Sequence, residues 1–187
     1  MAGIVLAGGR AVRFGSNKAL APFRGEPLIA WSLAILRPAC RAIAINGPET
    51  TAGPLGLPAL PDPPGAPQGP LAGVLAGLDW AAAQGFETLM TVPCDTPFLP
   101  REMAARFISE LGNAPLIAAR AERPHPLCAL WRVETRTALR ALSRTGKHPP
   151  LSAVLESLGG IWAGFPDEKA FANLNTQAEF EAAQQVL

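Results

Sequence analysis

Residues 3–25 are GIVLAGGRAVRFGSNKALAPFRG, an apolar run that gives way to glycines and positive charge. A short apolar run bounded by glycine is typical of a buried strand, so residues 2–7 predict the first strand of the fold. The loop that follows contains the glycines Gly8, Gly9 and Gly15 and the cations Arg10, Arg13 and Lys18. Since such residues cannot build a core, we expect this loop to serve a ligand.

The composition of the loop predicts a cradle for phosphate groups. Glycines let the backbone approach a ligand and leave N–H groups free to point at it. Arginine and lysine add positive charge for phosphate oxygens. Neither GxxxxGK[ST] nor GxGxxG is present, so the cradle differs from two common phosphate-binding loops. The alternative is a tight turn with solvated cations, but turns rarely need this many glycines and cations together.

Alternating strands and helices extend outward from this first unit. Predicted strands are 2–7, 41–46, 57–60, 87–93, 114–120 and 126–133, the last two as a possible hairpin. Predicted helices are 27–36, 71–84, 101–111, 134–146, 151–160 and 176–187, the last with a threonine N-cap. The proline- and glycine-rich stretch 48–70 predicts an irregular but ordered loop. This order indicates a single-domain, three-layer α/β/α fold with a mostly parallel, Rossmann-like sheet.

The overall composition limits the classes of function. The 187 residues suffice for one domain, and 49% of them are hydrophobic. With 16 basic and 15 acidic residues, the net charge of +1 argues against nucleic-acid and membrane partners. The three cysteines form no CxxC pair and indicate neither a disulfide framework nor a zinc site. Since the sequence has neither a signal peptide nor an apolar run near ~20 residues, we expect a cytoplasmic protein. We also expect it to be a monomer.

Polar residues follow the other predicted strands at the edge where ligands bind in parallel α/β sheets. Asn46 follows the second strand, Asp62 the short third one, and Asp95 the fourth. A carboxylate opposite a polyphosphate cradle suits Mg²⁺, which one or two carboxylates and phosphate oxygens usually hold. The alternative for Asp95 is a helix N-cap. Its neighbour Cys94 is better explained by packing than by nucleophilic catalysis.

The second half of the chain leaves several alternatives open. His125, in RPHPLCALW, either lines the site or lies on a surface loop. Asn173 and Asn175 precede the last predicted helix, where turn and cap formation would explain them equally well. Three arginines on one predicted helix indicate a solvated face, with a second phosphate contact as the minority alternative: Arg136, Arg140 and Arg144.

Four motifs together resemble a known family. They are LAGGRAVRFGSNKAL (6–20), GPLAG (69–73), PCDTPFLP (93–100) and FANLNT (171–176). Their order and spacing, over nearly the whole chain, resemble nucleotidyltransferases with the motif LAGG-x-x-x-R-M-G-x-D-K, and most of all the molybdenum cofactor guanylyltransferases. The resemblance implies transfer of GMP from GTP to molybdenum-molybdopterin with release of pyrophosphate, and Mg²⁺ as cofactor. Molybdenum-insertion proteins and acceptor molybdoenzymes are candidate partners.

The resemblance also implies roles for individual residues. Arg13, Lys18 and Asp95 would be catalytic, and Asp95 would bind the metal. The implied contacts to GTP are Leu6, Ala7, Gly8, Gly9, Gly15, Lys18, Asn46, Asp62 and Asp95. Asn173 and Asn175 would lie toward the pterin. Within the single domain 1–187, residues up to about 100 would bind the nucleotide and residues 101–187 the acceptor.

Two departures from the family pattern keep further functions open. Asn17 replaces the usual aspartate before the lysine, and Phe14 replaces a methionine. RFG also occurs in cytidylyltransferases that use the same pterin, although these relatives have LAAG where this chain has LAGG. A second glycine leaves room for a purine and favours the guanylyl branch, as does GPLAG. A sugar-phosphate transferase of the same fold and a non-catalytic nucleotide- or cofactor-binding protein are also compatible with these residues.

Overall fold

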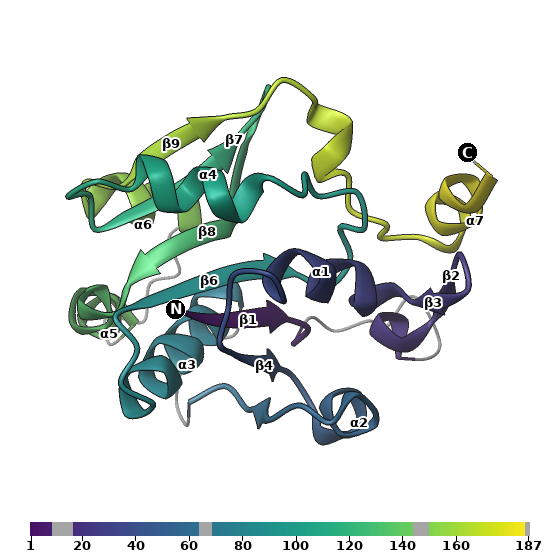
Figure 1. Cartoon of the computed structure of the whole chain (residues 1–187), viewed down its shortest axis with the longest axis horizontal. Helices are drawn as coiled ribbons and strands as arrows, with labels where there is room; N and C mark the ends of the chain where they lie inside the picture. The colour runs from purple at the N-terminus through teal and green to yellow at the C-terminus, as the bar shows by residue number, and fades with distance from the viewer. Residues whose placement is uncertain (9–16, 64–68, 144–149, 186–187) are drawn as a thin grey trace.

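The computed structural model describes residues 1–8, 17–63, 69–143 and 150–185. A seven-stranded sheet forms the middle layer, with helices on both faces, which confirms the predicted α/β/α architecture (Figure 1). The strands are β1 Ala2–Leu6, β4 Ala42–Asn46, β5 Ala59–Leu60, β6 Thr88–Pro93, β7 Leu116–Arg120, β8 Pro124–Arg132 and β9 Ile161–Gly164. The α-helices are α1 Leu28–Leu36, α2 Glu49–Ala52, α3 Pro70–Ala83, α4 Met103–Glu110, α5 Arg136–Ser143, α6 Leu151–Ser157 and α7 Gln177–Gln185. Short 3-10 turns are η1 Lys18–Leu20, η2 Gly53–Leu55, η3 Val133–Thr135 and η4 Glu168–Phe171.

The strand order is β5-β4-β1-β6-β8-β7-β9. Parallel pairs join β1 to β4 and β6, β4 to β5, and β7 to β9. The strand β8 is antiparallel to both of its neighbours, β6 and β7, and forms the expected hairpin with β7. The chain runs outward from β1 in both directions. A ligand crevice is therefore expected beyond the carboxyl end of β1.

Alternating side chains along the strands divide the core between the two faces of the sheet. Val5 belongs to the cluster that includes the buried side chains of α1 and α4. Its neighbour Ile4 belongs to the cluster under α3, α5 and α6. This period of two is the geometry of a strand buried on both faces. Both layers are therefore needed to keep the central strands out of water.

Some elements differ from those predicted. The helix expected over 151–160 ends at Ser157, and residues 161–164 form the edge strand β9. The predicted loop 48–70 contains the helical turns α2 and η2. A small hairpin, β2 Pro22–Phe23 with β3 Glu26–Pro27, follows the first loop. These segments are too short to show a hydrophobic period, and neighbouring structure decides their conformation.

The C-terminal helix α7 begins with the predicted threonine cap. Thr176 Oγ1 accepts a hydrogen bond from the backbone N–H of Glu179 at 3.1 Å, and the Glu179 carboxylate accepts one from the backbone N–H of Thr176 at 2.8 Å. This reciprocal pair is a capping box. Phe180 of α7 packs edge-on against Phe23 with 5.3 Å between ring centroids, so the helix covers the β2–β3 hairpin (Figure 1).

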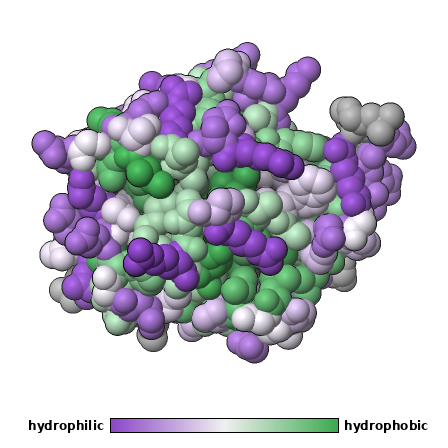
Figure 2. Space-filling model, in the orientation of Figure 1, coloured by the Kyte–Doolittle hydropathy of each residue, from purple (hydrophilic) through white to green (hydrophobic). Residues whose placement is uncertain are grey.

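The molecular surface is mixed in character. On the face shown in Figure 2, apolar side chains are interspersed with hydrophilic ones. Among the described residues, Ile108 and Ile161 are the large hydrophobic side chains that remain exposed. None of the helices in the described ranges has the length and apolar character needed to cross a membrane.

Candidate functional site

A cleft of about 880 Å³ lies at the carboxyl ends of β1, β4 and β6. Leu6 at the end of β1 pairs in register with Asn46 of β4 and Pro93 of β6, so the residues that follow these strands lie side by side. The lining includes the predicted residues Leu6, Ala7, Gly8, Lys18, Asn46, Asp62, Asp95, Asn173 and Asn175. The structure therefore brings these nine residues into one cavity, as the topology of a parallel sheet requires.

An ion pair lies at the floor of the cleft. Lys18 Nζ is 3.0 Å from Asp95 Oδ2, and their side chains are 11% and 19% exposed. The turn η1 holds Lys18, and Asp95 lies just beyond β6, where the N–H of Cys94 donates to the carbonyl of Leu6 at 3.1 Å. Since both charges are largely withdrawn from water, each depends on a partner of opposite sign. The cleft thus presents a fixed cation and a fixed carboxylate together.

A second polar contact fixes the side chain of Asn46. Its amide nitrogen donates to Asp62 Oδ1 at 2.9 Å and to the carbonyl of Leu60 at 3.0 Å, which uses both amide hydrogens. The amide oxygen then faces helix α3, where a Cβ on Gly73 would lie 2.2 Å from it. The glycine of GPLAG is therefore required by the packing of Asn46. Asp62 remains exposed at the cleft and can accept hydrogen bonds from a ligand.

Asn17 ties the end of the first loop to helix α2. Its amide nitrogen donates to Thr51 Oγ1 at 2.7 Å. Both residues line the cleft. The amide therefore has a structural partner of its own, on the side of the cleft formed by the segment after β4.

Cys94 has no chemical activation in this site. Burial and the neighbouring Asp95 carboxylate raise the pKa of its thiol to about 12, with Lys18 opposing them. A thiol with this pKa is almost entirely protonated at neutral pH and is a weak nucleophile. The cysteine therefore contributes packing.

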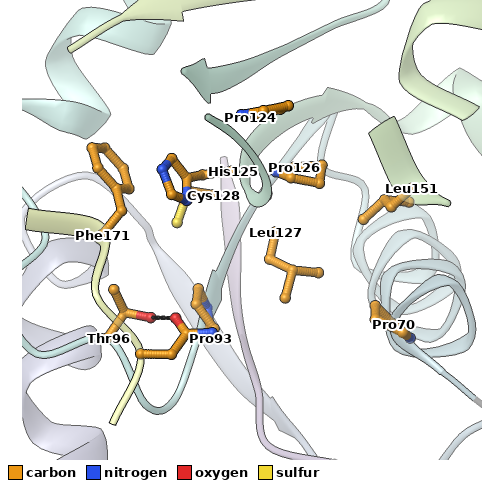
Figure 3. A pocket seen from close by; sticks show the side chains of 11 residues that line it. Pro70, Pro93, Thr96, Pro124, His125, Pro126, Leu127, Cys128, Leu151 and Phe171 are labelled. Carbon is orange, nitrogen blue, oxygen red and sulfur yellow. Dashed lines mark hydrogen bonds between the residues drawn. The ribbon is translucent and has the colours of Figure 1, made fainter. Parts of the chain in front are cut away.

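A second cavity of about 330 Å³ adjoins the cleft. The two share Pro70, Pro93, Leu127 and Asn173 in their linings. Figure 3 shows His125 beside Phe171 on one side of this cavity and Pro70 and Leu151 on the other. His125 therefore lines the cavity that adjoins the cleft, and it belongs to the strand β8 Pro124–Arg132 and not to a surface loop.

Asn173 stands between the two cavities. Its amide oxygen accepts a hydrogen bond from Thr96 Oγ1 at 2.9 Å, drawn as a dashed line in Figure 3. The next residue, Leu174, donates its N–H to the carbonyl of Asp95 at 2.9 Å. The C-terminal segment is thus attached to the loop after β6. No local pattern indicates this contact, since 77 residues separate Thr96 from Asn173.

The other predicted residues either fall outside the described residues or belong to helix α5. Gly9, Arg13 and Gly15, together with Arg10, Phe14 and Arg144, fall outside the described residues. Arg140 of α5 is exposed and forms an ion pair with Asp79 of α3. Arg140 thus agrees with the predicted solvated face, whereas Arg136 of the same helix is half-buried.

The metal-binding capacity of the described residues is limited. They contain no group of three or more histidine, cysteine, aspartate or glutamate side chains that could hold an ion together. A metal at Asp95 would therefore need further ligands from a bound substrate, and Mg²⁺ is commonly bound in this way in phosphoryl-transfer sites.

Comparison with known proteins identifies the family of this chain. Residues 3–160 match the family described as MobA-like NTP transferase domain. A molybdenum cofactor guanylyltransferase of Cereibacter sphaeroides is 41% identical over 188 residues, covering 99% of this chain and 96% of the relative. The chain belongs to the molybdenum cofactor guanylyltransferase family. A further family member, from Rhodobacter capsulatus, is 43% identical and covers 98% of this chain and 95% of its own length.

A solved structure shows the same fold. The molybdopterin-guanine dinucleotide biosynthesis protein A of Archaeoglobus fulgidus superposes with a TM-score of 0.77, covering 99% of this chain and 97% of that chain at 23% identity. The two proteins therefore share one fold over nearly their full lengths.

Proposed function

We propose that this protein transfers GMP from GTP to molybdenum-molybdopterin, forming the guanine dinucleotide cofactor and releasing pyrophosphate. Family membership supports the reaction, and the observation that carries the proposal to this chain is the pair of adjoining cavities. One contains the fixed charges of Lys18 and Asp95, and the other is mostly apolar. Two cavities that meet at Asn173 suit a reaction that joins two substrates.

The chemical step asks little covalent chemistry of the protein. An oxygen of the acceptor's phosphate attacks the α-phosphorus of GTP in line. A new P–O bond forms as the bond from the α-phosphorus to the bridging oxygen breaks, and that electron pair leaves with pyrophosphate. Positioning and stabilisation of charge dominate such a transfer. This agrees with the cleft, where the thiol of Cys94 has a raised pKa and is a weak nucleophile.

Lys18 supplies positive charge to the phosphates. Lys18 is 9% exposed, so water screens the charge of its ammonium group only weakly. The turn η1 fixes the position of the residue. Arg13 would add a second cation from the same loop. The proposed role of the cations in the first loop is therefore to neutralise the negative charge of the triphosphate.

Asp95 is the residue proposed to hold Mg²⁺. Its carboxylate is 19% exposed at the cleft, and phosphate oxygens of GTP would complete the ligand set. When bound, the ion would neutralise charge that develops on the phosphate oxygens. Lys18, 3.0 Å from the same carboxylate, helps to hold it in the cleft where those phosphates would lie.

We propose GTP as the nucleotide because family membership favours it and because Gly8 and Asp62 both lie beside Asn46 in the cleft. Gly8 lies next to Asn46, where a Cβ would come within 3.2 Å of the amide oxygen. Asp62 offers an acceptor to N–H or hydroxyl donors of a nucleoside. Calorimetric titration with GTP and CTP, each with Mg²⁺, tests the choice. We expect GTP to be preferred by at least about tenfold, or ~1.4 kcal/mol.

Each competing function has its own outcome. A preference for CTP would assign the protein to the cytidylyl branch. Pyrophosphate release with GTP and a sugar phosphate, but not with molybdopterin, would indicate a sugar-phosphate transferase. Nucleotide binding without pyrophosphate release from GTP and molybdopterin would indicate a binding protein.

A further inference from the structure

His125, which forms part of the wall of the second cavity, is paired with a carboxylate behind it. His125 Nε2 lies 3.1 Å from Glu168 Oε2, and the side chains are 17% and 16% exposed. His125 belongs to β8, and Glu168 begins the turn η4, 43 residues later. Because the pair joins two distant segments at a cavity, its orientation depends on the tertiary fold.

Glu168 is held as an anion by several donors. Arg123 donates from Nε to Oε1 at 2.9 Å and from its backbone N–H to Oε2 at 3.2 Å. Burial alone would raise the pKa of the carboxyl, but the hydrogen bonds from His125 and Arg123 outweigh it and lower that pKa to about 2. A carboxylate accepts hydrogen bonds only, so the hydrogen of the His125 ring lies on Nε2. The other ring nitrogen, Nδ1, takes no part in this contact.

Phe171 fixes the plane of the imidazole. The two rings stack with 4.4 Å between centroids and 14° between planes. Phe171 is 4% exposed and packs edge-on against Phe165 at 5.3 Å, so it cannot turn away easily. His125 is thus held by a hydrogen bond at one edge and by an aromatic ring on one face.

The rest of the cavity wall is apolar with a few polar groups. Pro124, Pro126, Leu127 and Leu151 line it, and Figure 3 shows Leu127 and Leu151 across from Phe171. Apart from His125, the polar side chains of the lining include Thr96 and Asn173, which bond to each other. Apolar walls with a few fixed hydrogen-bonding groups are the usual design of a small-molecule site, and the Phe171 stack leaves His125 in one fixed plane at that wall.

We propose that His125 is a recognition residue for the pterin ring of the acceptor, and that Glu168 is the positioning residue that sets the hydrogen-bonding state of His125. This inference rests on the proposed function, because that function supplies an acceptor with a planar, hydrogen-bonding ring. The second cavity would hold the ring, and the acceptor's phosphate would extend past Asn173 toward Lys18 and Asp95.

Binding of a small pterin tests the inference without turnover. The probe is 6-hydroxymethylpterin, whose fluorescence is followed as protein is added. We expect saturable binding to the unmodified protein. His125→Ala should bind about tenfold more weakly, because a hydrogen-bonding group of the cavity wall is removed. Glu168→Gln should lose less affinity. His125→Gln, which retains a polar side chain, should recover part of the affinity. Glu110→Gln, which alters an ion-paired carboxylate on α4, is the matched control and should bind like the unmodified protein.

Kinetics separates a positioning role from general damage. With GTP and molybdopterin as substrates, His125→Ala and Glu168→Gln should raise the KM for molybdopterin and leave that for GTP unchanged. Unaltered pterin affinity in His125→Ala, or no pterin binding by the unmodified protein, would overturn the inference. If the unmodified protein released pyrophosphate and both variants kept its KM for molybdopterin, the inference would fail and the proposed function would stand. If the unmodified protein released no pyrophosphate, the proposed function would be refuted. The pterin titration would still test whether the second cavity binds a pterin.

Discussion

Lys18 Nζ lies 3.0 Å from Asp95 Oδ2, although 77 residues separate the two in the chain. The pair connects the first loop to the segment after β6 and sets one charge of each sign at the floor of the cleft. Neither side chain is more than 19% exposed, so the two charges interact at low solvent screening. The ion pair therefore links the residue proposed to bind the phosphates to the residue proposed to bind the metal.

Replacing Asp95 by asparagine tests the metal role. The amide keeps the shape of the side chain and removes its charge, so Lys18 keeps a polar neighbour. We expect kcat to decrease by about 100-fold or more, the range seen when a group that stabilises transition-state charge is removed. Pyrophosphate release as a function of Mg²⁺ concentration is the measurement. Unmodified rates at saturating Mg²⁺ would rule out Asp95 as the metal ligand.

Replacing Gly73 by alanine tests the link between helix α3 and the nucleotide cleft. The new Cβ would lie 2.2 Å from Asn46 Oδ1, and that side chain cannot move without breaking its bonds to Asp62 and Leu60. We expect a loss of about 1–3 kcal/mol in the free energy of unfolding and weaker GTP binding.

Gly77→Ala is the matched control on the same helix. Its Cβ would meet the terminal methyl groups of Ile4 and Leu89 at 2.9 Å, away from the cleft. Calorimetry should give an unchanged GTP dissociation constant for this variant. Equal GTP affinity in Gly73→Ala and the unmodified protein would show that Asn46 does not position the nucleotide.

Replacing Asn17 by aspartate tests the departure from the family motif. In the variant, the Thr51 hydroxyl can donate to the carboxylate in place of accepting from the amide, so the bond between loop and α2 is kept. We expect unchanged thermal stability and pyrophosphate release that is equal or faster. Asn17→Ala, which removes the bond, should cost about 1 kcal/mol in unfolding free energy. Loss of activity in the aspartate variant would show that the loop is adjusted to the amide.

The Glu168 carboxyl makes the stability of the native state sensitive to acid. Its pKa is lowered from 4.5 to about 2 in the folded protein, so the folded state binds the proton less readily than the unfolded state does. The stabilisation is complete above about pH 4.5 and is lost as the pH falls toward 2. Unfolding midpoints of the unmodified protein and Glu168→Gln should therefore differ at pH 7 and converge in acid. A difference that stays constant down to pH 2 would contradict the shifted pKa.

The sequence predicted the parts of the fold whose residues repeat a pattern. Periodic apolar residues located the helices around 28–36 and 70–83, and continuous apolar runs located β1 and β6. The strand β9 has four residues, one of them buried, and follows two glycines, so no local period marks it. Its conformation is set by pairing with β7, a tertiary contact that short sequence windows do not contain.

The residues of the candidate site that directly follow strands could be predicted from the sequence. Asn46, Asp62 and Asp95 were found because parallel strands bring their carboxyl ends together. Glu168 was missed because its partner His125 is 43 residues away and neither residue belongs to a motif. The Mg²⁺ cofactor, the monomeric state, the protein partners and the division of the domain near residue 100 stay predictions.

The reversed direction of β8 has a consequence for how two substrates can meet. In a sheet of parallel strands only, each strand offers the site the residues that follow its carboxyl end. Because β8 is antiparallel to β6 and β7, its first residues, from Pro124 to Leu127, lie at that same edge. Because of this one inverted strand, the same edge of the sheet carries two adjoining cavities, the cleft and the second cavity. We therefore expect mutations in β8 and η4 to change binding of the acceptor and to leave binding of the nucleotide intact.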